Sequence, residues 1–124
     1  MSEIKDYISY TDDDGSVNIS EDVLAIIAGS AAAETEGVHA LYPSYGRDIG
    51  ELLSKKSLSR SVKIATNEQS VTIDVFLVVE LAVAVNSVAE AVQKAIAEAV
   101  ESSVGIKPSA VNVHICGISL KKNK

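Results

Sequence analysis

The 124-residue sequence predicts one α+β domain, a two-layer sandwich in which helices pack on one face of a mainly antiparallel sheet. Three observations predict this class. The segment 70–81 alternates apolar and polar residues at period two, which is typical of a half-buried strand. The segments 21–36 and 87–104 carry apolar residues at helical spacing. Shorter alternating stretches at 17–19, 38–41, 60–66 and 110–118 supply further strands.

Composition limits both the core and the partners. Hydrophobic residues make up 47% of the chain and charged residues 23%, as in globular domains, while aromatics are only 4%, so the core must be aliphatic. The net charge of −6 repels phosphate backbones, and no nucleic-acid partner is therefore expected. The single cysteine, Cys116, excludes an internal disulfide and fits a reducing compartment.

The sequence predicts a cytoplasmic protein. The first residues lack the basic and apolar regions of a signal peptide. The most apolar window, residues 75–89, contains Glu80 and Asn86 and is shorter than the ~20 residues of a spanning helix. We expect no direct membrane insertion, so any membrane association would be peripheral or through a partner.

The first third of the chain is expected to hold an arm, a short strand and a helix. Residues 1–15 are predicted to form a flexible N-terminal arm that ends in an acidic turn. The domain then spans residues 16–118. Ser20 is expected to cap the helix 21–36, and Gly37 to terminate it. Residues 29–33 have little side-chain bulk, so another backbone can approach this flank, from within the domain or from another chain.

The middle of the chain is expected to contain a short strand at 38–41, a loop, and a short amphipathic helix at 48–56. A hairpin then joins the strand at 60–66 to the segment 70–81 through residues 67–69. The basic cluster at 55–60 is interpreted as neutralising a helix C-terminus rather than binding RNA or lipid. The segment 70–81 is about twice the usual strand length, so it should outrun its partner or bend at a bulge.

The last third is predicted to contain the strongest helix and a final strand. Ser87 and Glu90 match a capping box, and Gly105 should end the helix. In the strand 110–118, alternation should place Asn112, His114 and Cys116 on one side. Residues 119–124 form a basic C-terminal tail. The apolar stripe of the helix consists of Val88, Val92, Ala95, Ile96, Ala99 and Val100.

Five segments of this sequence resemble the alkaline shock protein family, also called the general stress or envelope stress response family of Gram-positive bacteria. The similarity covers roughly residues 16–118, and the order and spacing of the segments carry it. The segments are VNISEDV (17–23), IIAGSAA (26–32), EGV (36–38), VTIDVFLVVE (71–80) and VNVHI (111–115). The resemblance implies a bacterial cytoplasmic protein that is not an enzyme, and some family members assemble near the membrane through a membrane-embedded partner.

Candidate chemistry is sparse. His114 and Cys116 lie two apart on a strand, where side chains are held nearly 7 Å apart, too far for a Cys–His nucleophile pair. Asp74 and His114 would form a cross-strand pair on the polar side if their strands are neighbours. His39, His114 and Cys116 lack the spacing of metal ligands. We therefore predict no catalytic residues, no metal site and no cofactor.

The interaction surface is expected on the polar side of the sheet, at Asp74, Phe76, Val78 and His114. Self-association is expected through a free edge of the strand 70–81 or through the small-residue flank of the first helix. Val78→Lys should block such an edge at little cost to the core. The predicted function is a non-enzymatic protein-interaction module in the envelope stress response, which self-associates and docks to a membrane-linked partner. The alternative is a regulator or ligand-binding protein in lipid metabolism, which would need a closed apolar pocket.

Overall fold

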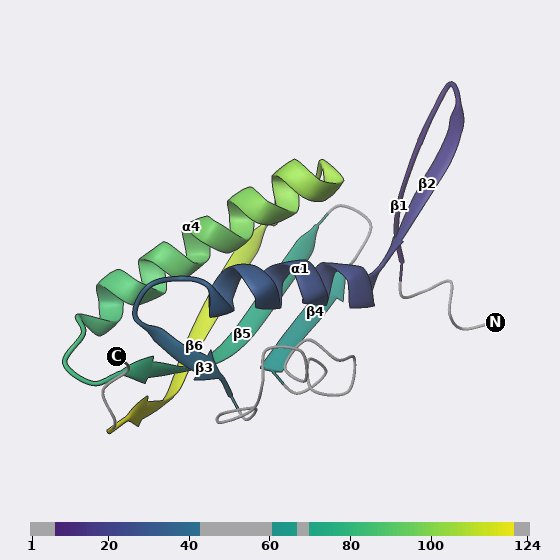
Figure 1. The fold of residues 1–124 in the computed structure, drawn as a ribbon. Coiled ribbons are helices and arrows are strands. Elements are labelled where there is room, and N and C mark those ends of the chain that lie inside the picture. The colour runs from purple at the N-terminus through teal and green to yellow at the C-terminus, as the bar shows by residue number, and fades with distance from the viewer. Residues whose placement is uncertain (1–6, 43–60, 67–69, 121–124) are drawn as a thin grey trace.

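A computed structural model describes residues 7–42, 61–66 and 70–120 of the chain (Figure 1). The predicted helix at 48–56, the basic cluster at 55–60 and the connection at 67–69 lie outside these residues. Within them, two helices cover one face of a four-stranded sheet, which confirms the α+β class. The elements are β1 (Tyr7–Asp12), β2 (Gly15–Ser20), α1 (Glu21–Ala33), β3 (Val38–Leu41), β4 (Val62–Thr66), β5 (Val71–Glu80), α4 (Val85–Val104) and β6 (Ala110–Ser119).

β5 is the centre of the sheet. β6 pairs with it in parallel over residues 72–80. β4 pairs with residues 71–75 and β3 with residues 77–79, both antiparallel. A strand has only two edges, so β3 and β4 must lie end to end on the edge that β6 leaves open. The expectation that β5 offers a free edge is therefore wrong, because both of its edges are occupied along almost its whole length.

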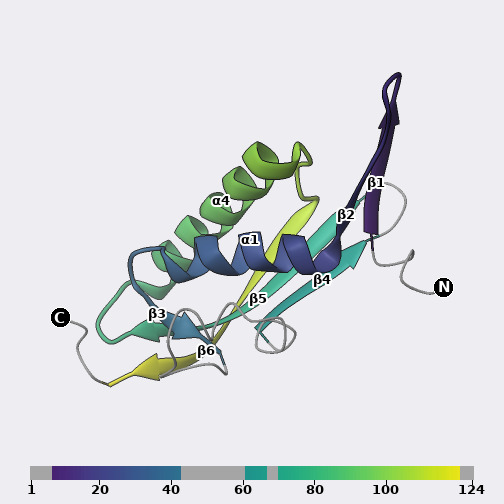
Figure 2. The same cartoon turned by 45° about the vertical axis from the view of Figure 1, so that its right-hand side comes forward.

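The N-terminal segment forms a hairpin where a flexible arm was expected. β1 and β2 pair antiparallel from Tyr7 opposite Ser20 to Asp12 opposite Gly15, and Gly15 takes the positive φ of 131° at the acidic turn. The Ser9 hydroxyl donates to the Asn18 side-chain oxygen across the two strands. Figures 1 and 2 show the hairpin projecting from the body of the domain. The arm and the short strand of the sequence prediction are thus the two sides of one structure.

α1 begins as predicted but ends earlier. The backbone N–H of Val23 donates to the Ser20 hydroxyl at 3.3 Å, which confirms the N-cap. The last helical residue is Ala33, with Glu34 as C-cap, so Gly37 does not terminate the helix. Gly37 instead enters β3 with φ +96°, and a Cβ there would lie 2.6 Å from Val88 Cγ2. The missing side chain lets α4 approach this corner of the sheet.

The core lies between the helices and one face of the sheet. The small-residue flank of α1 contributes Ala28, Gly29 and Ala32, all buried inside the domain, so those residues serve packing within the chain. From α4 the core takes four of the six residues of the predicted apolar stripe, and from β5 it takes the odd-numbered positions 71 to 79, whereas Leu81 is 42% exposed. These residues are Val88, Val92, Ile96 and Val100 of α4, and Val71, Ile73, Val75, Leu77 and Val79 of β5.

The capping box predicted for α4 does not form. The helix begins at Val85, with Ala84 as an N-cap that has no side-chain hydrogen bond, so Ser87 lies inside the first turn. The reason is the tight connection from β5, in which Ala82 takes a left-handed φ of 72°. Gly105 ends the helix at φ +79°, as predicted. Neither α1 nor α4, the helices of the described ranges, combines the length and hydropathy of a membrane-spanning segment.

Candidate interaction surface

The sheet face turned away from the helices carries the predicted site residues. This polar face, as we call it below, is built mainly from β5 and β6, whose parallel register places Asp74 opposite Asn112 and Phe76 opposite His114. His114 is therefore the diagonal neighbour of Asp74. The residues of the polar face are Thr72, Asp74, Phe76, Val78 and Glu80 of β5 and Asn112, His114 and Cys116 of β6.

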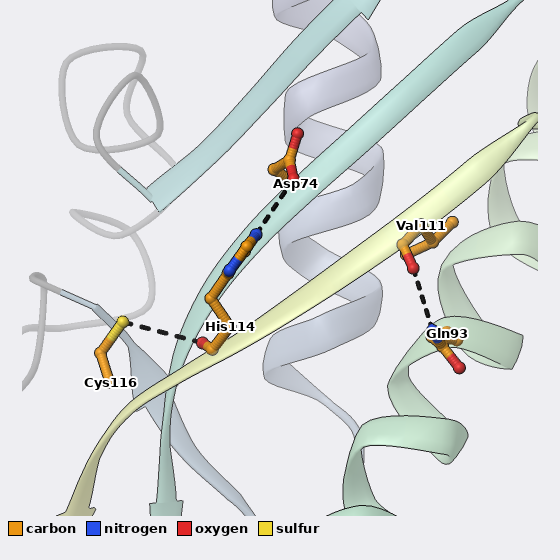
Figure 3. Close-up of polar contacts among 5 residues, drawn as sticks. All are labelled: Asp74, Gln93, Val111, His114 and Cys116. Atoms are coloured by element: carbon orange, nitrogen blue, oxygen red, sulfur yellow. Dashed lines mark hydrogen bonds and ion pairs between the residues drawn. The ribbon is translucent and has the colours of Figure 1, made fainter.

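Asp74 and His114 form the cross-strand pair that the sequence predicted. The Nε2 atom of His114 lies 3.0 Å from Oδ1 of Asp74, and the two side chains point toward each other across the strands (Figure 3). The His114 side chain is 45% exposed and that of Asp74 29%. A pair this accessible contributes little to stability, about 0–1 kcal/mol, but it fixes two polar groups where a partner can reach them.

The His114 ring is also stacked on Phe76. Their ring centroids are 4.5 Å apart and their planes differ by 13°. Asp74 thus holds the ring of His114 through one of its nitrogens, while Phe76 covers one of its flat sides. Two contacts of different kinds restrict the imidazole, so the three side chains form a preorganised cluster. A partner would lose little side-chain entropy on binding it.

The cluster also changes the acidity of Asp74. The hydrogen bond from His114 lowers the pKa of the Asp74 carboxyl below its usual value, partial burial opposes the shift, and a hydrogen bond from Asn112 adds to it. Lys63 of β4 lies opposite Asp74 on the other side of β5. The carboxylate is therefore ionised through the physiological range and presents a fixed negative charge at the middle of the polar face.

Cys116 and His114 lie on the same strand without forming a nucleophile pair. The exposed thiol of Cys116 contacts the backbone carbonyl oxygen of His114 at 3.8 Å, whereas the His114 ring turns toward Asp74 (Figure 3). His39 lies on β3, at the opposite edge of the sheet. His39, His114 and Cys116 are therefore not brought together, and the structure shows no metal-binding group within its described ranges.

Val78 was expected to be exposed on the interaction surface, and the structure shows that it is buried. It is only 5% exposed, so it is not available on the surface as the sequence analysis assumed. The pairing of β5 with β6 shifts by one residue after Leu77, and this shift places Gly117 opposite Val78. A Cβ at Gly117 would lie 3.7 Å from Val78 Cγ2, so the valine packs closely over the glycine backbone. Asp74, Phe76 and His114 remain the candidate site.

Sequence analysis missed a second surface, at the base of the hairpin. An open groove of about 700 Å³ lies between β2 and the adjoining ends of α1 and α4. Val17 and Val23 are 42% and 43% exposed there, beside Ile19 and Val104. The apolar residues at alternate positions 8 and 10 could have predicted β1. The segment is short and ends in three aspartates, so it was interpreted as an arm and a turn.

Comparison with known proteins identifies the family. The family model for alkaline shock protein 23, described as having a cell envelope-related function, matches residues 9–120. Spy1535 of Streptococcus pyogenes serotype M6 is 35% identical over 109 residues, which cover 87% of this chain and 82% of the relative. YqhY of Bacillus subtilis strain 168 is 32% identical over 104 residues, covering 84% and 77%. YloU of the same strain is 27% identical over 106 residues, covering 84% and 88%.

No solved structure gives a significant match to this chain. The family match begins at residue 9, so it includes most of β1, which the sequence analysis had placed in an arm outside the domain. It also spans both strands that carry Asp74, Phe76 and His114. The resemblance seen in the sequence is confirmed, and the chain belongs to the alkaline shock protein 23 family, which has a cell envelope-related function.

Proposed function

We propose that this protein is a non-enzymatic interaction module of the cell-envelope stress response. In this proposal it is cytoplasmic, self-associates, and docks to a membrane-embedded partner at the inner face of the membrane. The observation that supports docking is the cluster of Asp74, Phe76 and His114, an ordered set of charged, aromatic and titratable side chains on an accessible sheet face. The cell envelope-related function of the family supports the cellular setting.

The chemistry of the cluster favours a protein segment as its ligand. The ionised Asp74 can accept from an arginine, a lysine or a backbone N–H. The stacked rings of Phe76 and His114 offer a flat apolar surface beside that charge. Anchors of this kind, in which an aromatic group is combined with a fixed charge, are typical of interface hot spots. The partner segment is therefore expected to carry a basic residue next to an apolar one.

The lipid-metabolism alternative needs a pocket that encloses an apolar ligand. The groove at the hairpin base is lined by valine and isoleucine but also by Asn18, Ser20 and Ser103, and it opens to solvent. An open groove of mixed polarity fits a protein surface better than an acyl chain, which is bound in largely enclosed apolar sites. The interaction module is accordingly the function that we propose.

The experiment is a comparative affinity capture from a Gram-positive host, with separate analysis of membrane and soluble fractions. The bait is the parent protein beside Asp74→Ala and His114→Ala, and the matched control is Glu98→Ala, an exposed change on the helix layer. We expect one integral membrane protein to be captured by the parent and the control and to be depleted at least tenfold with both cluster variants. Equal capture by all four baits would exclude the polar face as the docking surface.

A further inference from the structure

β6 forms one border of the sheet, and its outer edge is unpaired within the part of the chain that the structure describes. The strand has ten residues and pairs with β5 on one side only (Figure 1). The other border consists of β3 and β4, which are four and five residues long, and β4 carries the charged Lys63. β6 is therefore the longest edge strand of the described sheet. An open edge of this length is a template for an additional strand.

Two backbone hydrogen bonds show which groups of β6 face the open edge. The N–H of Tyr42 donates to the carbonyl of Phe76 on the β3 side of β5, and the N–H of Ser109 donates to the carbonyl of Val71 on the β6 side, each at 2.8 Å. Even-numbered residues of β5 thus turn their backbone groups away from β6, and odd-numbered residues turn theirs toward it. In a parallel pair, such a residue bonds to the neighbours of its register partner rather than to the partner itself. Odd positions of β5 are in register with the odd positions 111, 113 and 115 of β6, so these three turn their N–H and C=O groups outward.

Gln93 of α4 agrees with this orientation. Its Nε2 atom donates to the carbonyl oxygen of Val111 at 3.0 Å, and Figure 3 shows the side chain reaching β6 from the side opposite to β5. Among the described residues, no such contact engages the outward backbone groups of Val113 and Ile115. Donors and acceptors that recur at every second residue of a strand are matched by another extended chain. The open edge therefore selects an extended segment as its ligand.

The open edge lacks most of the features that prevent strand addition. Proteins commonly protect such edges with lysine, proline, inward-pointing charges or a bulge. Residues 110–115 contain no lysine, arginine, aspartate, glutamate or proline. The shift in register between β5 and β6 comes only after Ile115, so the segment before it pairs regularly. Residues 110–115 are therefore available for pairing.

The two sides of this edge differ in polarity. On the helix side, Val113 and Ile115 are half-buried and pack against the core. The flank of α4 that bears Gln93 carries small residues one turn before and one turn after it, Ala89 and Ala97. On the other side, the edge borders the charged and aromatic cluster of the polar face. An added strand would thus have apolar residues toward α4 and polar residues beside the cluster.

Charge favours a basic segment over a second copy of this chain. An added strand would lie about 5 Å from β6 and about 10 Å from β5, so the long side chain of a lysine or arginine on its polar side can reach toward Asp74. The carboxylate of Asp74 is ionised and already accepts from His114. A second copy would bring its own net charge of −6 to the contact, which like-charge repulsion disfavours.

We propose that β6 binds an extended segment of a partner protein as an additional strand of the sheet. The apolar residues of this segment face α4, and its basic residues face the cluster. This inference rests on the proposed function, because it names how the partner docks beside Asp74 and His114. Main-chain hydrogen bonds to Val113 and Ile115 supply affinity, and the alternating side chains supply specificity.

The first test uses a synthetic peptide as long as β6, in which valine alternates with lysine, and measures its Kd for the parent by fluorescence anisotropy. Two control peptides differ in one property each: one has N-methylated backbone amides, and the other has glutamate in place of lysine. We expect both controls to bind at least tenfold more weakly, because the first cannot donate main-chain hydrogen bonds and the second reverses the charge. Equal binding of the N-methylated peptide, or no binding of the unmodified peptide at high micromolar concentration, would overturn strand addition.

Amide hydrogen exchange by NMR locates the contact on the parent. In the free protein, the amides of Val113 and Ile115 should exchange at least tenfold faster than those of Asn112 and His114, which face β5. Adding the valine–lysine peptide should slow exchange at Val113 and Ile115 at least tenfold. Binding that leaves these two amides unprotected would place the peptide elsewhere and contradict the proposal.

Val113→Pro removes one outward N–H and no hydrogen bond of the ladder, which is the position where an edge strand accepts proline. Val113→Thr is the matched control, because it loses a similar part of the apolar side chain and keeps the N–H. We expect the two variants to melt within a few degrees of each other, while the proline variant binds the peptide at least tenfold more weakly. A proline variant that unfolds where the threonine variant is stable would show that this N–H is bonded within the sheet, and the open edge would be refuted.

Affinity capture from the Gram-positive host separates this inference from the proposed function. We expect Val113→Pro to lose the membrane protein that Asp74→Ala loses, whereas Val113→Thr retains it. If Val113→Pro retained the protein and Asp74→Ala lost it, the polar face would dock its partner without strand addition, so this inference would fail and the proposed function would stand. If the main effect of Val113→Pro were to turn an associating parent into a monomer in light scattering, the edge would bind a second copy, which would also overturn the inference.

Discussion

Side chains of β5 lie on both faces of the sheet, and the two faces differ in how deeply those side chains are buried. On the helix-covered side, Ile73, Val75, Leu77 and Val79 are completely buried, and Val71 nearly so. On the polar face, Thr72, Asp74, Phe76 and Glu80 are only partly covered. Neighbouring residues of one strand therefore lie in different environments: the odd-numbered positions pack in the core, and four of the five even-numbered positions are partly exposed to solvent.

The comparison indicates that the stability of the domain and the proposed interaction surface can be altered separately. Contacts on the helix side are numerous and apolar, so a lost side chain there leaves a cavity. Contacts in the cluster of Asp74, Phe76 and His114 are few and partly hydrated, so a lost side chain there exposes its neighbours to water at small cost. Val78 is an exception. It lies on the polar face, but its side chain is buried like a core residue.

The largest effect is expected from Leu77→Ala. Leu77 is fully buried between β5 and the helix layer, and its truncation should lower the free energy of unfolding by about 2–5 kcal/mol. For a domain of this size the corresponding fall in Tm is roughly 10–20 °C. Thermal denaturation followed by circular dichroism measures it. A fall of less than 3 °C would mean that the odd-numbered face is not the core.

The second-largest effect is expected from Val78→Lys, which tests whether Val78 is buried although it lies on the polar face of the sheet. Val78→Lys places a charge where only 5% of the valine is exposed, so we expect destabilisation by roughly 2–4 kcal/mol, in contrast to the sequence-based prediction of little cost. Urea denaturation of the parent and the variant gives the difference. A variant as stable as the parent would show that the lysine escapes to solvent and that the polar face is open at this point.

Two glycine substitutions measure how closely the helix layer approaches the sheet. Gly37→Ala combines a positive φ with a contact at 2.6 Å to Val88, and we expect a loss of about 1–3 kcal/mol. Gly105→Ala is the matched control, because it also has a positive φ but no atom within 4 Å of the added Cβ. The control should lose about 1 kcal/mol. Equal losses of stability in the two variants would mean that the close contact with Val88 adds nothing to the cost of an alanine at position 37.

The smallest effect concerns the pH dependence of the cluster. The folded state lowers the pKa of Asp74, so the carboxylate contributes stability that is complete above its ordinary pKa of about 3.9 and is lost as the pH falls through the lower folded value. At neutral pH, Asp74→Asn should reduce Tm by only a few degrees. The difference from the parent should shrink as the pH falls below that ordinary value, because the Asp74 carboxyl then becomes neutral like the amide. A constant difference across this range would assign the effect to packing.

The same cluster offers a direct spectroscopic check. His114→Ala removes the hydrogen bond that contributes most to the shift, so the pKa of Asp74 should rise toward its ordinary value in a carboxyl NMR titration. Asn112→Ala removes a hydrogen bond that lowers the pKa of Asp74 by less, so the pKa should rise by a smaller amount in this variant. An Asp74 pKa that is unchanged in His114→Ala would show that the two side chains are not paired in solution.

Local patterns predicted much of the fold because their causes are local. Alternation in β5 and β6 identified the buried positions, and the helical stripe from Val88 to Val100 identified the inner side of α4. Ser20 was recognised as a cap because its partner is only three residues away. The capping box predicted at Ser87 was wrong for the opposite reason, because the start of α4 is not set by local residues. The turn that starts α4 at Val85 depends on where β5 ends, and no local pattern encodes that position.

The sequence by itself determined which side of each strand and helix faces inward, because the periods of two and 3.6 residues are properties of the backbone. Only the tertiary structure decided which strands are neighbours, since alternation assigns a face but not a partner. Asp74 and His114 are 40 residues apart and meet because β6 returns parallel to β5. The burial of Val78 and the need for glycine at position 37 follow from such long-range contacts, which no short segment can specify.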